Sequence, residues 1–238
     1  MVAVHLNKQI DDIFSGYSKL RTPEERIEHK VEGNMICEGF EELVRQYEDI
    51  LAIYDWLEVE VAVKEINAIL EPEQINSFLQ AMKRYESYKN HASRTGIFIT
   101  QLIQNSHYDG NNKFTLSTKA SSKGIDCLAY KLQGREDRSL EIIVEGDVGD
   151  CCCQDGKNIG RLYINGGTGV WCSTWVRNIQ EFHISGHAGE FCGCNAENST
   201  FKTPNKETLR LLKYNVPKDK DNRIFFIHPN SQEEEIKW

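Results

Sequence analysis

A 20-residue repeat in the middle of the 238-residue chain constrains the fold more than any other feature. Three blocks, residues 139–158, 159–178 and 179–198, align one under another without a gap. Two glycines, one cysteine, one asparagine and one aliphatic position recur in each block. The recurring columns are Gly146/Gly166/Gly186, Gly149/Gly169/Gly189, Cys152/Cys172/Cys192, Asn158/Asn178/Asn198 and Val144/Ile164/Ile184. Self-similarity at a period of this length is typical of proteins built from stacked structural repeats.

Each block predicts one coil of a β-solenoid. Ile142 and Val144 lie two positions apart, so both side chains share one face of a short strand. The glycines that follow permit the tight corners that a coil needs. Coils stacked about 4.8 Å apart bring identical side chains into columns, and the asparagine column is expected to form a ladder at a turn. We therefore predict a short right-handed parallel β-helix with 20-residue coils.

Residues 1–110 predict a helical region. The segment Thr22–Glu25 has the form of a capping box with proline at the first helical position. Further helical periodicity occurs in residues 59–70, 75–85 and 97–103. Between the capping box and residue 59, one apolar stripe at helical spacing is formed by Phe40, Leu43, Val44, Tyr47, Ile50, Leu51 and Tyr54.

Residues 111–238 predict the β-solenoid and a C-terminal cap. An irregular first coil is expected over 111–138, with strand-like stretches at 113–117 and 127–131. A strand, a helix and a strand are expected at 200–203, 204–214 and 223–228. Because the end strands of a short solenoid invite edge-to-edge pairing, they need covering elements. The predicted fold class is α+β, with the helical region packed on the solenoid and the strand-helix-strand unit closing its far end.

Charge and hydropathy exclude several classes of partner. The chain has 28 basic and 36 acidic residues, a net charge of −8, which opposes binding to nucleic acid and to anionic membranes. Its apolar runs are far shorter than the roughly 20 residues of a membrane span. The N-terminus lacks the basic and apolar regions of a signal peptide, so a reducing, cytoplasmic location is expected for the eight cysteines.

The glycine columns resemble a known architecture. At Gly146-x-x-Gly149, Gly166-x-x-Gly169 and Gly186-x-x-Gly189 the repeat resembles the GXGXG β-solenoid of the glutamate synthase C-terminal domain and the related formylmethanofuran dehydrogenase subunit. The resemblance covers residues 139–200, and this chain lacks a consistent third glycine while adding cysteine and aromatic columns. The resemblance implies a structural and docking domain, and it assigns no active-site residue to this chain.

The cysteines of the repeat allow two interpretations. One is a metal site, for which the candidate ligands are Cys152, Cys172, Cys192, Cys194, His183 and His187. The other is a ladder of buried thiols, because free cysteine packs as a small hydrophobic residue. The ladder is favoured because the chain has no CxxC pair, the common zinc spacing, and no cofactor is expected.

A column of large aromatic residues accompanies the cysteines. Strand alternation places positions 151 and 152 on opposite sides, so either column could be internal. We expect the cysteines to lie inside, so that Trp171, Phe191 and Trp175 form an outer patch. This patch is expected to be covered by the N-terminal helices or a second subunit rather than to bind an aromatic ligand.

No nucleophile, base and orienting group converge in the sequence. The expected function is therefore a non-catalytic protein-interaction or assembly module that binds a protein partner or associates with itself, with a homo-oligomer as one form. The alternative is a small metalloprotein or enzyme using the cysteine-rich face.

Overall fold

The structure, a computed structural model, describes residues 40–122 and 124–237, so the helix start expected at 22–25 lies outside the described residues. The chain divides between Glu48 and Asp49 into two units, each of which is described by itself. Helix α3 (Glu41–Ala52) crosses this boundary. Of its predicted apolar stripe, the buried members are Phe40, Leu43, Tyr47, Ile50 and Leu51.

The stripe is shorter than predicted, because α3 ends at Ala52 and Tyr54 lies beyond it with 82% of its surface exposed. Helix α4 (Trp56–Lys64) begins directly afterwards. Its N-cap is Asp55, whose carboxylate accepts hydrogen bonds from the backbone N–H groups of Leu57 and Glu58 at 2.8 and 3.1 Å.

Two longer helices complete the helical part of the second unit. The prediction of one helix over 59–70 is wrong at its end, since α4 stops at Lys64. Helix α5 (Pro72–Met82) starts with proline at its first turn and continues into the 3₁₀ helix η1 (Lys83–Tyr85), and α6 spans His91–Asp109. None of the helices in the described ranges is long and apolar enough to span a membrane.

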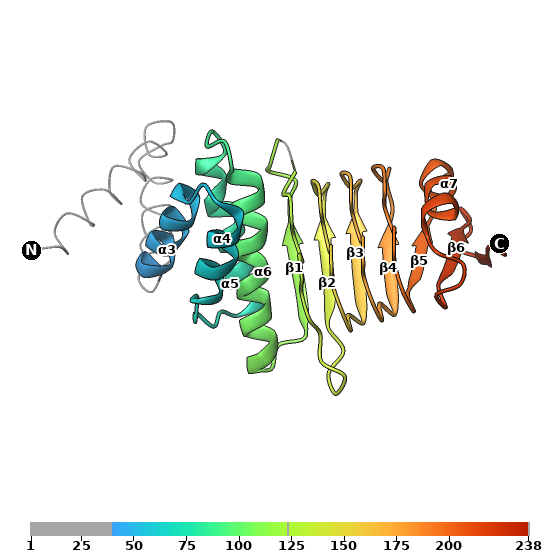
Figure 1. Cartoon of the computed structure of the whole chain (residues 1–238), viewed down its shortest axis with the longest axis horizontal. Helices are drawn as coiled ribbons and strands as arrows, with labels where there is room; N and C mark the ends of the chain where they lie inside the picture. Colours follow the sequence, from blue (N-terminus) through green and yellow to red (C-terminus); the bar gives the residue numbers. More distant parts are fainter. Residues whose placement is uncertain (1–39, 123, 238) are drawn as a thin grey trace, which may run out of the picture. The chain divides into compact units, whose positions relative to one another are not determined.

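The remaining chain forms a seven-stranded sheet whose strands follow one another in chain order, as Figure 1 shows. Strands β1 to β6 pair in parallel, and β7 pairs with β6 in antiparallel fashion. The protein is thus α+β, with helices and a mostly parallel, open sheet. The strands are β1 (Lys113–Ser117), β2 (Glu141–Glu145), β3 (Arg161–Asn165), β4 (Glu181–Ile184), β5 (Thr200–Thr203), β6 (Arg223–Ile227) and β7 (Glu233–Glu235).

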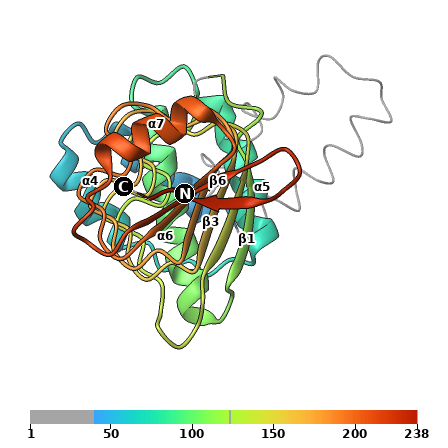
Figure 2. The ribbon, with the colours of Figure 1, turned by 90° about the vertical axis from the view of Figure 1, so that its right-hand side faces the viewer.

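The register of the central strands equals the period of the repeat. Ile142 lies opposite Leu162, and Leu162 lies opposite Phe182, so each partner is 20 residues further along the chain. Side chains alternate between a buried and a more exposed position along each strand. When the sheet is viewed along the direction in which its strands follow one another, successive repeats overlie one another (Figure 2).

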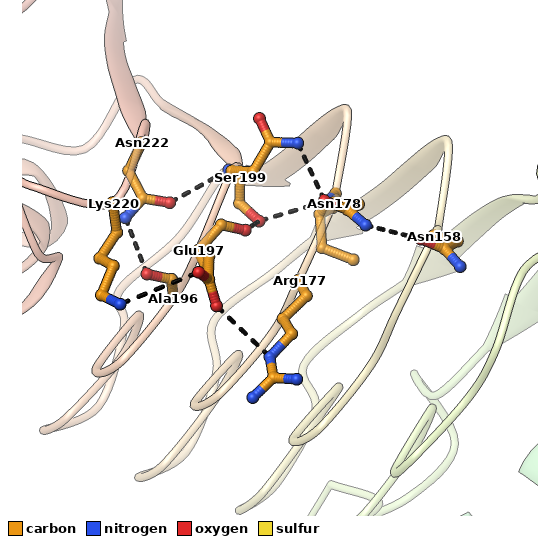
Figure 3. Close-up of polar contacts among 10 residues, drawn as sticks. Asn158, Arg177, Asn178, Ala196, Glu197, Ser199, Lys220 and Asn222 are labelled. Carbon is orange, nitrogen blue, oxygen red and sulfur yellow. Dashed lines mark hydrogen bonds and ion pairs between the residues drawn. The ribbon is translucent and has the colours of Figure 1, made fainter.

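The asparagine column forms hydrogen bonds from one repeat to the next. The Asn178 amide donates to the Oδ1 of Asn158 at 2.8 Å, and the Asn198 amide donates to the Oδ1 of Asn178 at 2.9 Å (Figure 3). All three asparagines have positive φ, a conformation that asparagine tolerates better than most residues. The predicted ladder of amides is therefore confirmed. Beyond it, Asn222 Oδ1 accepts a hydrogen bond from the backbone N–H of Ser199 at 3.0 Å.

The segments after each strand are turns rather than further strands. The strand-like prediction for 127–131 is wrong, because Cys127, Ala129 and Lys131 have positive φ and the chain forms successive turns there. The backbone groups bond instead to the next repeat. The N–H of Cys127 donates to the carbonyl oxygen of Asp150 at 2.7 Å, and that of Cys151 donates to Val170 at 2.9 Å.

Helices cover the β1 edge of the sheet. The Gln80 side chain of α5 donates to the carbonyl oxygen of Ser117 at 2.5 Å, and Asn76 Oδ1 accepts from the N–H of Ser117 at 2.8 Å. Gly96 of α6 lies so close to the carbonyl of Asp126 that a side chain at this position would collide with it. The backbone groups of β1 that would otherwise pair with another strand are therefore partly occupied.

The far edge of the sheet carries a helix and a short charged strand. Helix α7 (Lys206–Asn215) is fixed by Thr208, whose hydroxyl accepts from the N–H of Ala188 and donates to the carbonyl of Gly186, both at 2.9 Å. Strand β7, which the sequence did not predict, consists of three exposed glutamates. A row of like charges on an edge strand opposes pairing with another sheet.

Candidate protein interface

The cysteine column lies inside the molecule. Cys152, Cys172 and Cys192 are completely buried, which agrees with the predicted inward orientation. Burial, together with the hydrogen bond to Cys152, raises the pKa of the Cys172 thiol well above its ordinary value. The Ser173 hydroxyl lies 3.6 Å from the sulfur of Cys192. Because metal binding and nucleophilic attack need the thiolate, these neutral thiols fit a packing role.

The other proposed metal ligands lie in separate places. Cys194 is only partly buried, in a turn. His183 is on β4, where its ring contacts that of Tyr163 with centroids 5.5 Å apart. His187 is at an exposed corner with its Nδ1 3.4 Å from the carboxylate of Glu207. Over residues 40–122 and 124–237, no group of three or more His, Cys, Asp or Glu side chains is arranged to hold a metal ion.

The outward face of the sheet carries charges that pair with one another. Glu141 lies 2.9 Å from Lys113 and 3.5 Å from Arg161, on the strands to either side of it. Lys202 contacts Glu233 at 2.7 Å and Glu181 at 3.4 Å. These cross-strand pairs stabilise the sheet and leave few charges on this face for a partner.

Unlike the charged residues of the sheet, the large aromatic residues lie on the turns between the strands. Trp171 and Phe191 stack with ring centroids 4.3 Å apart and planes 14° from parallel, and Trp171 and Trp175 stack at 6.5 Å and 13°. Their exposed fractions are 39% for Trp171, 40% for Trp175 and 42% for Phe191. We call these three rings the aromatic face. The sequence identified its members, but not that their planes are parallel.

Two carboxylates flank the aromatic face. Asp155 is in the turn one repeat before Trp175, because its N–H donates to the carbonyl oxygen of Thr174 at 2.9 Å. Glu190 directly precedes Phe191 and is exposed. Among the described residues, neither carboxylate makes a side-chain hydrogen bond or an ion pair. The aromatic face is thus bordered by negative charge that no described side chain neutralises.

A cleft of about 280 Å³ lies between α4, α6 and the turn at residues 130–133. Glu60 in its wall accepts hydrogen bonds from the Trp56 indole and the Tyr130 hydroxyl, each at 2.9 Å, and from Lys131 at 2.8 Å. Burial of the Glu60 carboxylate raises its pKa, but the hydrogen bonds from Lys131, Tyr130 and Trp56 outweigh this and hold the pKa below its ordinary value.

The polar groups of this cluster bond to one another and hold α4 against the turns, so they are not available to bind a ligand in the cleft. The charges of Glu60 and Lys131 neutralise each other, and Tyr130 packs edge-on against Trp56 with centroids 5.7 Å apart. Sequence reasoning missed the cluster because Glu60 and Lys131 are 71 residues apart and neither lies in a motif.

Comparison of the chain with family models, with curated proteins and with solved structures finds no match.

Proposed function

We propose that this chain is a non-catalytic protein-interaction or assembly module, and that the aromatic face is its docking surface. The observation that carries the proposal is the exposure of about two fifths of each of three adjacent, mutually stacked rings. Tryptophan is enriched among the residues that dominate binding at protein interfaces. An exposed apolar patch rimmed by polar groups is typical of an interaction site.

The proposed scaffold for this surface is a right-handed parallel β-helix with 20-residue coils, similar in architecture to the GXGXG solenoid. The strand register of 20 residues and the hydrogen bonds along the Asn158, Asn178 and Asn198 column support it. In such a scaffold the buried cysteines at 152, 172 and 192 form a ladder that fills the core. A rigid coil holds the rings in place before a partner arrives, which lowers the entropic cost of binding.

The contrast between the two exposed surfaces also supports the proposal. On the sheet, Glu141 contacts Lys113 and Arg161 on the two adjacent strands, and Lys202 on β5 contacts Glu181 on β4 and Glu233 on β7. At the turns, the rings and the carboxylates of Asp155 and Glu190 have no such internal partners among the described side chains. Among the described residues, the part of the turn surface around the aromatic face is therefore the one whose carboxylates lack opposite charges.

Site-specific photocrosslinking in cells that express the full chain tests the proposal. A photoreactive phenylalanine analogue replaces Trp175, and the matched control carries it at Thr115, an exposed position on the outward face of β1. We expect a defined protein adduct from position 175 that is absent from position 115. The adduct is identified by mass spectrometry, and the purified partner must reproduce it.

In the same experiment, self-association would give an adduct with twice the mass of the chain. The proposal is wrong if position 175 gives no protein adduct, or if positions 175 and 115 give the same set of adducts.

A further inference from the structure

We propose that the aromatic face binds an arginine side chain presented by a basic segment of the partner protein, an inference that rests on the proposed function. The guanidinium stacks on the indole faces of Trp171 and Trp175, and the carboxylate of Asp155 accepts its N–H groups, while Glu190 adds negative charge at the opposite end of the ring stack. Three features of the surface support this assignment: a step in the ring stack, uncompensated negative charge, and the planarity of the rings.

The ring stack ends one repeat before Trp171. On one side Trp171 faces Phe191, at 4.3 Å. On the other side the equivalent position in the preceding repeat is Cys151, whose N–H donates to the carbonyl of Val170 at 2.9 Å. Asp155 precedes Trp175 in the same way. Small side chains therefore lie where a further ring would continue the stack, which leaves a step beside the two indoles. The height of this step is one strand spacing, about 4.8 Å, which is enough for one planar group.

The two indoles that border this step are nearly parallel. Their planes differ by 13° and their centroids are 6.5 Å apart. A flat group that continues the column therefore lies parallel to both indole planes. The guanidinium group of arginine is planar, stacks on aromatic faces and is attracted to their negative π-surface. Lysine, whose ammonium is compact and strongly hydrated, lacks this shape.

The charge around the step favours a cation. Asp155 lies within the step, and Glu190 lies at the opposite end of the ring stack, next to Phe191. Neither has a positive partner among the described residues, whereas Glu197 in the same turn layer is paired with Arg177 at 3.5 Å and Lys220 at 3.8 Å. A bidentate arginine–carboxylate contact is among the stronger polar interactions at an interface.

The same charge disfavours a second copy of this chain as the occupant. A two-fold symmetric dimer brings the same patch of both copies together, which would place Asp155 and Glu190 of one copy against those of the other. The net charge of −8 adds to this repulsion. A basic heterologous segment gains from the same charges.

Binding of short peptides to the purified full chain tests the inference. The probe is an acetylated and amidated seven-residue peptide with two arginines among glycine and serine. Its matched controls replace arginine with lysine or with the neutral, planar citrulline. Titration is followed by tryptophan fluorescence. We expect the arginine peptide to bind at least about fivefold more tightly than the lysine peptide, and the citrulline peptide to show no saturable binding.

Variants assign the binding to the site. Asp155→Asn and Trp175→Leu are each expected to weaken arginine-peptide binding about threefold or more, while Glu136→Gln, at an exposed carboxylate outside the repeats, leaves it unchanged. Unfolding in urea checks that each variant is folded. Asp155→Asn removes the charge without removing a side-chain hydrogen bond or ion pair to a described residue, so it remains informative if Trp175→Leu does not fold.

Three results would overturn the inference: equal binding of the arginine and lysine peptides, saturable citrulline binding, or an Asp155→Asn variant with full affinity. If photocrosslinking from position 175 still yields a partner, the interaction function stands and only the arginine assignment falls. If neither experiment detects binding, both fall. Self-association through position 175 without peptide binding assigns the face to a second copy instead.

Discussion

The indole of Trp171 lies on the ring of Phe191, with centroids 4.3 Å apart, although the two residues are separated by 20 positions in the chain. The separation equals the repeat period and the strand register, so both rings occupy the same position in consecutive repeats. The same periodicity that fills the interior with Cys172 and Cys192 thus builds the exposed stack. Interior packing and the proposed docking surface are therefore set by neighbouring residues of one turn.

The asparagine column is predicted to stabilise the stacked repeats. Asn178→Ala removes two amide hydrogen bonds and places alanine at a φ of 56°, so we expect the free energy of unfolding in urea to fall by about 3 kcal/mol. Asn178→Gly is the matched control, because it tolerates this φ and loses the amide alone; about half the effect is expected. Equal stability of both variants and the wild type would contradict the role of the column.

The Glu60 cluster is predicted to hold α4 on the turns. Glu60→Gln should lower the free energy of unfolding at pH 7 by about 2 kcal/mol, since hydrogen bonds to a charged group are lost or weakened. Because the folded-state pKa of Glu60 is lowered, its contribution is present above the ordinary value of about 4.5 and is lost as pH falls through the folded pKa.

Urea unfolding between pH 3 and pH 7 measures this, and Lys131→Gln separates the ion pair from the Tyr130 and Trp56 contacts. A Glu60→Gln variant with the same pH profile as the wild type would show that the cluster is not coupled to folding.

His183 is predicted to oppose folding at mildly acidic pH. Burial lowers the pKa of His183 below its ordinary value of 6.5, and its Nε2 has no hydrogen-bond partner among the described residues. The unfolded chain therefore binds this proton more readily, so stability is highest above pH 6.5 and declines as pH falls from 6.5 towards the folded pKa.

Replacing His183 with Phe keeps a ring against Tyr163 and should remove this decline, raising stability at pH 7 by about 1 kcal/mol. Thermal unfolding at pH 5.5 and 7.5 compares it with His187→Asn, at an exposed corner. A His183→Phe variant less stable than wild type at both pH values would contradict the prediction.

The cysteines are predicted to differ sharply in reactivity. The hydrogen bond with Cys127 lowers the pKa of Cys151, which is partly exposed, whereas burial raises the pKa of Cys153 to about 12. Iodoacetamide labelling without denaturant, mapped by tandem mass spectrometry, should modify Cys151 and leave Cys152, Cys172 and Cys192 unmodified until the protein unfolds. Labelling of the buried column in the folded protein, or about one metal ion per purified chain, would favour the metalloprotein alternative.

Much of the sheet could be predicted because its signal is local and repeated. Ile142 and Val144 recur in kind in each repeat, and β1 coincides with the predicted 113–117. The turn at 127–131 was mistaken for a strand because Leu128 and the residues around it have strand-like composition, while its alternating positive φ values depend on backbone bonds to the next repeat.

The elements that sequence reasoning missed depend on distant contacts or lack apolar signal. Strand β7 consists only of glutamates, and it forms because β6 offers it a backbone partner. The cleft beside Glu60 requires α4 to meet a turn far along the chain. The outward position of the aromatic residues is confirmed, but the parallel alignment of their rings and the position of Asp155 beside them depend on how the repeats stack in three dimensions.

The most direct test of the central claim, that the aromatic face binds a protein, is calorimetric titration of the partner identified by crosslinking. Wild type is compared with Trp171→Leu and with Tyr54→Leu, which removes an aromatic ring that is 82% exposed and outside the aromatic face. We predict that Trp171→Leu weakens binding about thirtyfold or more, as expected for a tryptophan hot spot. Tyr54→Leu should bind as the wild type does. Equal affinity of the wild type and a folded Trp171→Leu variant would contradict the account.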